Sequence, residues 1–299
     1  KMEKIKVAVI GAGGKMGTRT SNNLVTKFPD KFDVKLVETF PPAVERIEKE
    51  RGLKVTPVDE ALAFADVVIF AVPDTLIKKL SAEYVPMLKP GTVFLILDPA
   101  AAVAKELTLR DDCTFGVAHP CHPSYFKWQK EEEAYQDRFG GEGGHQDIVM
   151  SCIQGDEEKF KLAQETARCM YRADKAFVMT SEQIAFLEPT LVETLGATCC
   201  YAMAETVNEA VKRGIDREAA VSFLTGHVFN LTANFLGYLP GNPPVSDACK
   251  VALEIGNHLV LRDDWKKIWD DELLRKVIAT MLHPETSQEN LGFDVKPQK

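Results

Sequence analysis

The sequence predicts an α/β protein in which a doubly wound parallel-sheet domain, residues 1–180, is followed by an all-helical domain, residues 181–299. Three observations support this fold class. Short apolar runs alternate with helical segments in the first part, which is typical of a parallel sheet covered by helices. A glycine-rich turn follows the first of these runs, where a helix is expected to begin. From Ser181 onward the strand patterns stop and helical periodicity takes over.

Each expected strand of the first domain is a nearly continuous apolar run, as in strands that are buried on both faces. The expected strands are Ile5–Ile10, Val34–Glu38, Val67–Ala71, Val93–Leu97, Thr114–Ala118, Ile148–Ile153 and Ala176–Met179. The helices expected between them are Lys15–Lys27, Pro42–Arg51, Asp74–Met87, Ala100–Glu106 and Glu157–Met170. The long segment after Ala118 contains a glycine cluster at 140–144, and we expect it to be a functional loop.

The second domain is expected to be helical throughout. A capping-box-like start at Ser181 and Gln183 begins its first stretch, which Pro189 interrupts and Gly214 ends. The polar tail from His283 is expected to be loosely held. The helical stretches are Ser181–Arg213, Asp216–Leu236, Asp247–Leu261 and Asp264–Leu282, with a proline-rich break at 239–244.

Composition and charge argue against several classes of function. The net charge of −8 argues against a nucleic-acid partner, because such proteins carry surplus Lys and Arg. The seven cysteines are odd in number and have no CxxC spacing, so neither a disulfide framework nor a zinc cluster is indicated. No apolar stretch approaches the roughly 20 residues of a membrane span, and the charged start leaves no room for a signal peptide. We therefore expect a soluble cytoplasmic protein with a small-molecule substrate.

The glycine turn has the spacing GxxGxxG, a variant of the dinucleotide-binding turn of Rossmann domains. Such glycines permit a tight exit from the strand and let main-chain N–H groups approach a pyrophosphate, which the helix N-terminus then faces. The residues expected to bind the coenzyme here are Gly11, Gly13, Gly14, Lys15, Met16 and Gly17.

Glu38 lies at the end of the second expected strand, 21 residues beyond Gly17. An acidic side chain at this place accepts hydrogen bonds from the ribose hydroxyls of the adenosine, and it repels a 2′-phosphate. The sequence therefore predicts NAD rather than NADP. In the alternative interpretation, the glycines form only a structural turn and Glu38 is a solvated charge at the end of a strand.

His119 and His122, in the segment His-Pro-Cys-His-Pro, follow the strand expected at Thr114–Ala118. Ligands of open α/β sheets bind at the carboxyl ends of the strands, so both imidazoles are expected to face the coenzyme crevice. Two histidines at this spacing can act as metal ligands, as a general base with a carboxylate binder, or as structural caps. We expect a catalytic role.

Glu188 is the third candidate catalytic residue. It precedes Pro189, which cannot continue a helix without the loss of a main-chain hydrogen bond, and a carboxylate at such a break often points into a site. Alternatively, Pro189 is the first residue of a new helix and Glu188 lies beside its positive end.

The segment Asp66–Pro73 resembles the fourth strand of the 6-phosphogluconate and β-hydroxyacid dehydrogenases. By that resemblance, Val72, Pro73 and Asp74 pass the coenzyme near its ribose and nicotinamide end. The chain as a whole resembles the 6-phosphogluconate dehydrogenase-like superfamily. It departs from the superfamily at Phe-Leu-Glu-Pro-Thr, 186–190, where a catalytic lysine and an asparagine are expected.

Four motifs together resemble the D-apionate oxidoisomerase branch of this superfamily: Gly-Ala-Gly-Gly-Lys-Met-Gly, His-Pro-Cys-His-Pro, Phe-Leu-Glu-Pro and the segment at 226–237. The resemblance implies NAD-dependent oxidation of a branched sugar acid, followed by a 1,2-shift that gives 3-oxo-isoapionate. A divalent cation such as Mg²⁺, chelated by a hydroxyl and the adjacent carbonyl, would assist that shift. His119, His122 and Glu188 are the expected ligands.

Four residues of the second domain are weaker candidates for substrate binding. His227, Asn230 and Asn234 recur at helical spacing and either line the cleft or form a polar stripe at a subunit contact. Lys250 either binds the substrate carboxylate or forms a solvated ion pair with Asp247. The apolar faces of these helices also predict a homodimer.

Two other functions stay open at this level. One is a plain or decarboxylating β-hydroxyacid dehydrogenase, with His119 as the base. The other is an NAD-binding sensor without turnover, against which the two histidines argue, because a sensor needs no such groups at the crevice.

Overall fold

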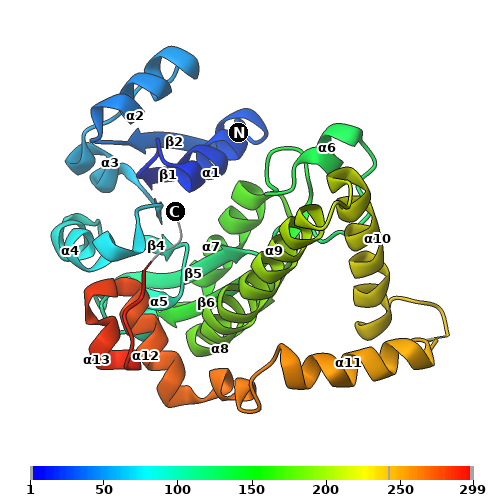
Figure 1. Ribbon diagram of the computed structural model, residues 1–299. Helices are drawn as coiled ribbons and strands as arrows, with labels where there is room; N and C mark the ends of the chain where they lie inside the picture. Colours follow the sequence, from blue (N-terminus) through cyan, green and yellow to red (C-terminus); the bar gives the residue numbers. More distant parts are fainter. Residues whose placement is uncertain (1–2, 242, 297–299) are drawn as a thin grey trace. The chain divides into compact units, whose positions relative to one another are not determined.

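The computed structural model describes residues 3–241 and 243–296. In this part of the chain, a seven-stranded sheet has the order β2-β1-β3-β4-β5-β6-β7 (Figure 1). Every strand that the sequence predicts is present, with bounds that differ by a few residues. The strands are β1 (Ile5–Ile10), β2 (Phe32–Val37), β3 (Val67–Phe70), β4 (Val93–Ile96), β5 (Thr114–Pro120), β6 (Gln146–Gln154) and β7 (Ala173–Val178).

The sheet is parallel from β2 to β5, which confirms the predicted fold class. The end of the sheet formed by β6 and β7 has the opposite strand direction, because β6 runs antiparallel to β5 and β7 runs parallel to β6. Pro120, which ends β5, pairs with Ile148 near the start of β6, so the chain enters β6 at the edge where it left β5. The segment 121–145 therefore connects two strand ends at the same edge of the sheet. It needs no crossover helix, because β5 and β6 are antiparallel.

Side chains alternate along the strands and bury both faces of the sheet. Ile69 and Leu95 join a core cluster with residues of α1 (Lys15–Thr26) and α7 (Glu157–Tyr171). Phe70 points to the other face, where the ring of Tyr84 in α4 (Asp74–Tyr84) lies edge-on at 6.4 Å. Helices therefore cover both faces, as in a doubly wound sheet.

The remaining helical elements of this part are short. Two of them, α3 and α6, are absent from the sequence prediction, because each is too short to show a helical period. They are α2 (Pro41–Glu45), which continues as the π-helix η1 (Arg46–Glu50), α3 (Val58–Phe64), the 3₁₀ turn η2 (Val85–Met87), α5 (Ala100–Val103), α6 (Glu132–Gln136) and α8 (Ser181–Ala185).

The start of α8 corrects one detail of the sequence analysis. Thr180, and not Ser181, caps the helix: its Oγ1 accepts a hydrogen bond from the N–H of Gln183 at 3.1 Å. The Gln183 side chain in turn accepts the N–H of Thr180 at 2.9 Å. This reciprocal pair is the capping box, and Gln183 stands three residues after Thr180, as that motif requires.

The chain divides into two compact units, of which the second comprises residues Phe186–Leu274. Its elements in the described residues are the π-helix η3 (Phe186–Ala197), α9 (Thr198–Lys212), α10 (Arg217–Phe235), α11 (Asp247–Leu259) and the 3₁₀ helix η4 (Trp265–Trp269). Pro189 lies inside η3, so the predicted interruption is a widened helical turn and not a gap. Asn242, in the predicted break, lies outside the described residues.

The chain from Arg275 onward belongs to the first unit. This part contains most of α12 (Asp271–Leu282), the 3₁₀ turn η5 (Pro284–Thr286) and α13 (Ser287–Leu291), drawn in red beside α4 and α5 in Figure 1. His283 Nε2 lies 2.8 Å from a carboxylate oxygen of Glu106, and Ser287 is buried. The prediction of a loosely held tail is therefore wrong for residues 283–291. The tail is polar in composition, but its polar side chains form specific contacts that hold it in place. None of the described helices has the length and apolar character that a membrane crossing requires.

Candidate active site

The carboxyl ends of the parallel strands bring most of the predicted site residues to one edge of the sheet. Glu38 comes directly after β2, and Gly11 comes directly after β1. Val72 is the second residue after β3. His119 lies in the last part of β5, at the same edge. Because β2, β1, β3, β4 and β5 are neighbours in this order, the edge runs from the glycine turn to the histidine. This is where ligands of open α/β sheets bind.

The glycine turn is built so that side chains are excluded. Gly11 has a φ of +76°, a conformation that favours glycine, and a Cβ there would overlap the carbonyl oxygen of Ala71. A Cβ on Gly17, in α1, would overlap the carbonyl oxygen of Gly11. The N–H of Gly14 donates to the same carbonyl oxygen at 3.1 Å, which closes the turn. Lys15 is the first residue of α1, and Met16 packs against the core.

Glu38 is held by three main-chain N–H groups at the end of β2. One carboxylate oxygen accepts the N–H of Gly13 at 3.0 Å, and the other accepts those of Thr39 at 2.9 Å and Phe40 at 3.0 Å. The same Gly13 residue is held on its carbonyl side by Arg46, whose Nη2 donates at 3.1 Å. Arg46 was not among the predicted residues, because it reaches the glycine turn only where η1 lies against that turn.

A cavity of about 290 Å³ lies beside the glycine turn and contains five predicted coenzyme residues in its wall: Gly11, Gly14, Glu38, Val72 and Pro73. Asp74 follows Pro73 as the first residue of α4. The turn without side chains and the adjoining cavity fit the phosphates and the adenosine of a dinucleotide. The apolar wall of this cavity was not predicted, although the spacing of four residues on α4 is its signal. Its residues are Leu76, Leu80 and Tyr84 of α4, together with Phe40.

His119 is fixed by main-chain contacts. Its Nδ1 lies 2.6 Å from the carbonyl oxygen of Leu97, just beyond β4. Because a carbonyl oxygen only accepts, Nδ1 carries the proton and the lone pair of the neutral ring is on Nε2. The buried Tyr171 hydroxyl donates to the carbonyl oxygen of Ala118 at 3.0 Å, and burial raises the pKa of Tyr171, so it stays a neutral donor. The end of β5 is therefore rigidly held.

His122 is the second residue of the segment 121–145, which connects β5 to β6. It has a φ of +60°, and its N–H donates to the side-chain oxygen of Gln146 at 3.1 Å. Its Nδ1 lies 2.6 Å from the carbonyl oxygen of Phe139, so its neutral ring also has the lone pair on Nε2. The Phe139 ring lies 4.0 Å from Nζ of Lys15 and 4.2 Å from the Arg19 guanidinium carbon. The segment thus contacts the first turns of α1.

Asp137 organises the glycine cluster of this segment. Its carboxylate accepts the N–H groups of Gly140, Glu142, Gly143 and Gly144, each at 2.9–3.0 Å. Burial acts to raise the pKa of Asp137, but these donors outweigh it and hold the pKa below its usual range. The glycine cluster was noted in the sequence, whereas Asp137 and Phe139 were missed, because their role depends on contacts with residues far away in the chain.

The expected metal ligands come from two different units of the chain. His119 and His122 belong to the first unit, and Glu188 lies in η3 of the second unit. Among residues 3–241 and 243–296, no three His, Cys, Asp or Glu side chains are grouped as ligands of a metal ion. The divalent cation that the resemblance implies, and its ligand set, therefore stay a prediction.

The weaker candidates lie in the second unit, on α10 and α11. His227 and Asn230 line an open hollow of about 470 Å³, and the His227 ring stacks on that of Phe223 at 4.1 Å. Asn234 donates to the carbonyl oxygen of Pro243. Lys250 pairs with Asp247 at 2.8 Å, one turn away on the exposed surface of α11.

Two family models match the chain. Residues 1–115 match the NADPH-binding domain of acetohydroxy acid isomeroreductase, and residues 127–282 match the C-terminal part of decarboxylating phosphogluconate dehydrogenase. The sheet, the glycine turn and these matches define an oxidoreductase with a Rossmann-type coenzyme domain and a helical domain of the 6-phosphogluconate dehydrogenase type.

Individual relatives narrow the class. The chain is 72% identical over 288 residues to a D-apionate oxidoisomerase from Blautia hydrogenotrophica, which covers 96% of this chain and 100% of the relative. It is 42% identical over 276 residues to a D-apionate oxidoisomerase from Cupriavidus necator, with 92% and 98% covered. The chain belongs to the D-apionate oxidoisomerase family.

A solved structure supports the same fold. The crystal structure of a semialdehyde dehydrogenase NAD-binding protein from Cupriavidus necator in complex with calcium and NAD has a TM-score of 0.88 to this chain. The two are 41% identical, and the match covers 93% of this chain and 100% of that protein.

Proposed function

We propose that the chain oxidises D-apionate with NAD and then rearranges the product by a 1,2-shift to 3-oxo-isoapionate. The observation that carries this proposal is the 72% identity to a D-apionate oxidoisomerase over 96% of the chain. The geometry supports it, because a dinucleotide cradle and a fixed histidine lie along one edge of one sheet. A sensor without turnover would not need the histidine.

The coenzyme is NAD in this proposal. The Glu38 carboxylate lines the cavity beside the glycine turn, where the adenosine ribose of a dinucleotide lies in Rossmann domains. A negative charge at this place disfavours a 2′-phosphate. The pyrophosphate lies against the turn, near Lys15, and bound NAD supplies the hydride acceptor.

In the oxidation step, His119 is the general base. Nε2 of its neutral ring takes the proton of the substrate hydroxyl while the hydrogen on the same carbon leaves as hydride. The alcohol becomes a 2-oxo acid, and the products are NADH and one proton. The hydrogen bond from Nδ1 to Leu97 holds the tautomer that this step requires.

In the rearrangement, a second base takes the proton of the hydroxyl next to the new carbonyl. The carbon substituent then moves with its bonding electrons to the carbonyl carbon, and the former carbonyl oxygen takes up a proton. We assign the base to His122, whose Nδ1 contact with Phe139 leaves the lone pair on Nε2. Glu188 is assigned the return of the proton. The step is redox-neutral, so no second oxidant is needed.

The divalent cation expected from the sequence stays a prediction, and neither step above is routed through it. Dialysis against a chelator tests it. Loss of activity that Mg²⁺ restores would support a metal, whereas full activity after dialysis would exclude a requirement for one.

Steady-state assays with a panel of sugar acids test the proposal. We expect NADH formation with D-apionate, and slower formation with acids of four to six carbons that lack its branch. Absence of NADH formation with D-apionate, in a protein that binds NADH, would contradict the proposed substrate.

A second candidate function is a decarboxylating hydroxyacid dehydrogenase. The match of residues 127–282 to the C-terminal part of decarboxylating phosphogluconate dehydrogenase favours it. The replacement of the expected lysine segment by Phe186-Leu187-Glu188-Pro189-Thr190 argues against it. Release of carbon dioxide from the substrate would decide for this alternative.

We also propose that the second unit binds substrate through His227, Asn230, Asn234 and Lys250. The protein is proposed to be cytoplasmic and to form a homodimer through this unit. Large apolar side chains are exposed on its helices, with Leu259 80%, Val260 76% and Phe223 71% exposed. Surfaces of this kind are normally covered by a partner. Light scattering in solution, with a mass twice that of one chain, would support the dimer, and the mass of one chain would contradict it.

A further inference from the structure

We infer that Arg19 of α1 is a positioning residue for the rearrangement step: it holds residues 137–141 against the coenzyme-binding helix and thereby orients the ring of His122. This inference rests on the proposed function, in which His122 is the base of the 1,2-shift and His119 is the base of the oxidation. Arg19 acts through Phe139, whose carbonyl group and ring both contact His122.

One face of α1 holds the segment 121–145. Arg19 and Asn23 are four residues apart, which places them on the same side of the helix. Nη1 of Arg19 donates to the carbonyl oxygen of Gly140 at 2.9 Å, and the side-chain amide of Asn23 donates to that of Gly141. Successive turns of the helix therefore hold successive residues of the segment.

Arg19 makes four contacts with this segment. Besides the bond to Gly140, its guanidinium carbon lies 4.2 Å from the centre of the Phe139 ring. Nη1 also lies 3.4 Å from a carboxylate oxygen of Asp137 and 3.9 Å from one of Glu142. The guanidinium is planar, so it stacks on a ring and donates to oxygens at the same time. Because the Arg19 side chain is only 20% exposed, these contacts fix the position of Phe139 relative to α1.

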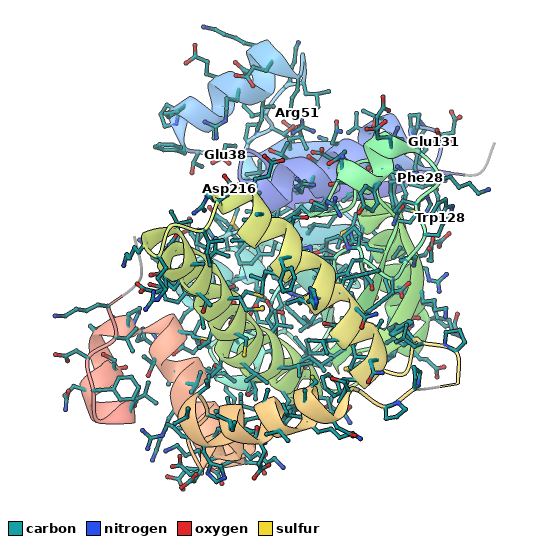
Figure 2. The ribbon with its side chains drawn as sticks, turned by 45° about the vertical axis from the view of Figure 1, so that its right-hand side comes forward. Phe28, Glu38, Arg51, Trp128, Glu131 and Asp216 are labelled. Atoms are coloured by element: carbon teal, nitrogen blue, oxygen red, sulfur yellow. The ribbon has the colours of Figure 1, made fainter. Side chains whose placement is uncertain are left out.

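The helix face that holds the segment is itself fixed. Asn23 is buried, and it also donates to the carbonyl oxygen of Met170 in α7 at 2.9 Å. Figure 2 labels Trp128 and Glu131 on the segment, which is drawn in green over the blue ribbon of α1. The segment is thus held against a helix that is anchored in the core of the first unit.

Phe139 connects Arg19 to His122. The Phe139 carbonyl oxygen lies 2.6 Å from Nδ1 of His122, and the two rings pack with their centres 4.6 Å apart. The main chain of His122 is held separately, because its N–H donates at 3.1 Å to the side chain of Gln146, which is buried. A shift of Phe139 would therefore change the direction of Nε2 and leave the main chain of His122 in place.

The two candidate bases depend on different anchors. Nδ1 of His119 lies 2.6 Å from the carbonyl oxygen of Leu97, just beyond β4. Nδ1 of His122 is anchored within the segment 121–145 instead. A change at Arg19 therefore leaves the base of the oxidation in place and misaligns the base of the rearrangement. Misalignment of this kind slows a step without removing the reacting group.

Single-turnover kinetics tests the inference, with the protein and NAD in excess over D-apionate. NADH absorbance gives the rate of oxidation, and NMR of quenched samples gives the amounts of 2-oxo acid and 3-oxo-isoapionate. For Arg19→Met we expect oxidation close to the wild-type rate and rearrangement slower by about tenfold or more, so that the 2-oxo acid accumulates. Arg19→Lys should lie between the two, because an ammonium group cannot stack on Phe139 and donate to Gly140 in the geometry of a guanidinium.

Arg138→Met is the matched control. Arg138 belongs to the same segment, and its guanidinium carbon lies 4.0 Å from the centre of the Tyr135 ring. This variant therefore also removes a guanidinium from an aromatic face, but not from Phe139. Its rates of oxidation and rearrangement should be those of the wild type.

Two results would overturn the inference. In the first, Arg19→Met slows both steps by the same factor or slows neither, which would make Arg19 at most a support of the coenzyme domain. In the second, Arg138→Met changes the ratio of the two rates as much as Arg19→Met does. If Arg19→Met does not fold, Arg19→Lys takes its place, and an unchanged ratio in that variant would contradict the inference.

The wild-type protein separates a failure of this inference from a failure of the proposed function. A wild-type protein that forms no 3-oxo-isoapionate contradicts the proposed function, and with it this inference. A wild-type protein that forms it, together with an Arg19→Met variant whose ratio of rates is unchanged, contradicts only the role of Arg19.

Discussion

The Nδ1 atom of His122 lies 2.6 Å from the main-chain carbonyl oxygen of Phe139, within the segment 121–145. The ring of Phe139 faces Lys15, the first residue of the helix that follows the glycine turn. One residue of the 121–145 segment thus contacts both parts of the candidate site.

Replacing Phe139 by alanine should uncouple these parts. Two contacts between a cation and the aromatic face, with Lys15 and Arg19, would be lost, each worth about 0.5–1 kcal/mol. The ring of Phe139 also packs 4.6 Å from the ring of His122, whereas the main-chain carbonyl oxygen that holds Nδ1 is kept in the variant. We expect kcat/KM for D-apionate to fall about tenfold, mostly in kcat, since the His122 ring loses this packing. Tyr125→Ala, in the same segment and half-exposed, is the control. Equal kinetic effects of the two variants would contradict a specific role for Phe139.

The variant His119→Asn distinguishes the basic nitrogen of His119 from its hydrogen bond to Leu97, because it removes the first and keeps the second. Asparagine can still donate to the carbonyl oxygen of Leu97 but has no basic nitrogen. We expect kcat to fall about 10²–10⁴-fold, the usual contribution of a general base, with NADH affinity and thermal stability near those of the wild type. His119→Ala serves as the comparison, because it also removes the hydrogen bond. A His119→Asn enzyme with more than half of the wild-type kcat would exclude His119 as the base.

Gly17→Ala should disrupt the turn. The new Cβ would overlap the carbonyl oxygen of Gly11, and overpacking of this kind costs about 1–3 kcal/mol. We expect a lower free energy of unfolding and weaker NADH binding, measured by denaturant unfolding and by titration. Gly256→Ala in α11 is the matched control, since nothing lies within 4 Å of its Cβ position. It should leave NADH binding unchanged and stabilise the helix by up to about 1 kcal/mol.

The pKa of Asp137 predicts a pH dependence of stability. Its pKa in the folded state is held below the ordinary value, so the carboxylate stabilises the fold above the pKa of the unfolded state, about 3.9. That contribution is lost as pH falls through the folded-state pKa. The difference in Tm between wild type and Asp137→Asn should therefore be largest above about pH 5 and shrink toward acid pH. A difference that is constant with pH would mean that the charge of Asp137 does not stabilise the glycine cluster.

Local patterns predicted much of this protein. The strands are visible because residues such as Val67–Phe70 and Val93–Ile96 are buried on both faces and are therefore continuously apolar. The glycine turn is predictable because the spacing of Gly11, Gly14 and Gly17 is that of a dinucleotide-binding turn that lies between a strand and a helix. Glu38 is predictable because the length of one helix and one strand fixes its place.

Features that depend on distant contacts were not predictable. The antiparallel direction of β6 depends on where the 121–145 segment enters the sheet, and no residue within β6 encodes that. Arg46, Asp137 and Phe139 act through contacts with Gly13, the glycine cluster and His122, which neither periodicity nor a motif reveals. The metal set of His119, His122 and Glu188 draws on both units, and it stays a prediction.

The carbon skeleton of the product tests the central claim most directly. The protein is incubated with NAD and ¹³C-labelled D-apionate, and the product is analysed by NMR while NADH formation is recorded. The account predicts one NADH for each D-apionate consumed and a product with the rearranged skeleton of 3-oxo-isoapionate. A product that retains the skeleton of D-apionate, or that has lost carbon dioxide, would contradict it.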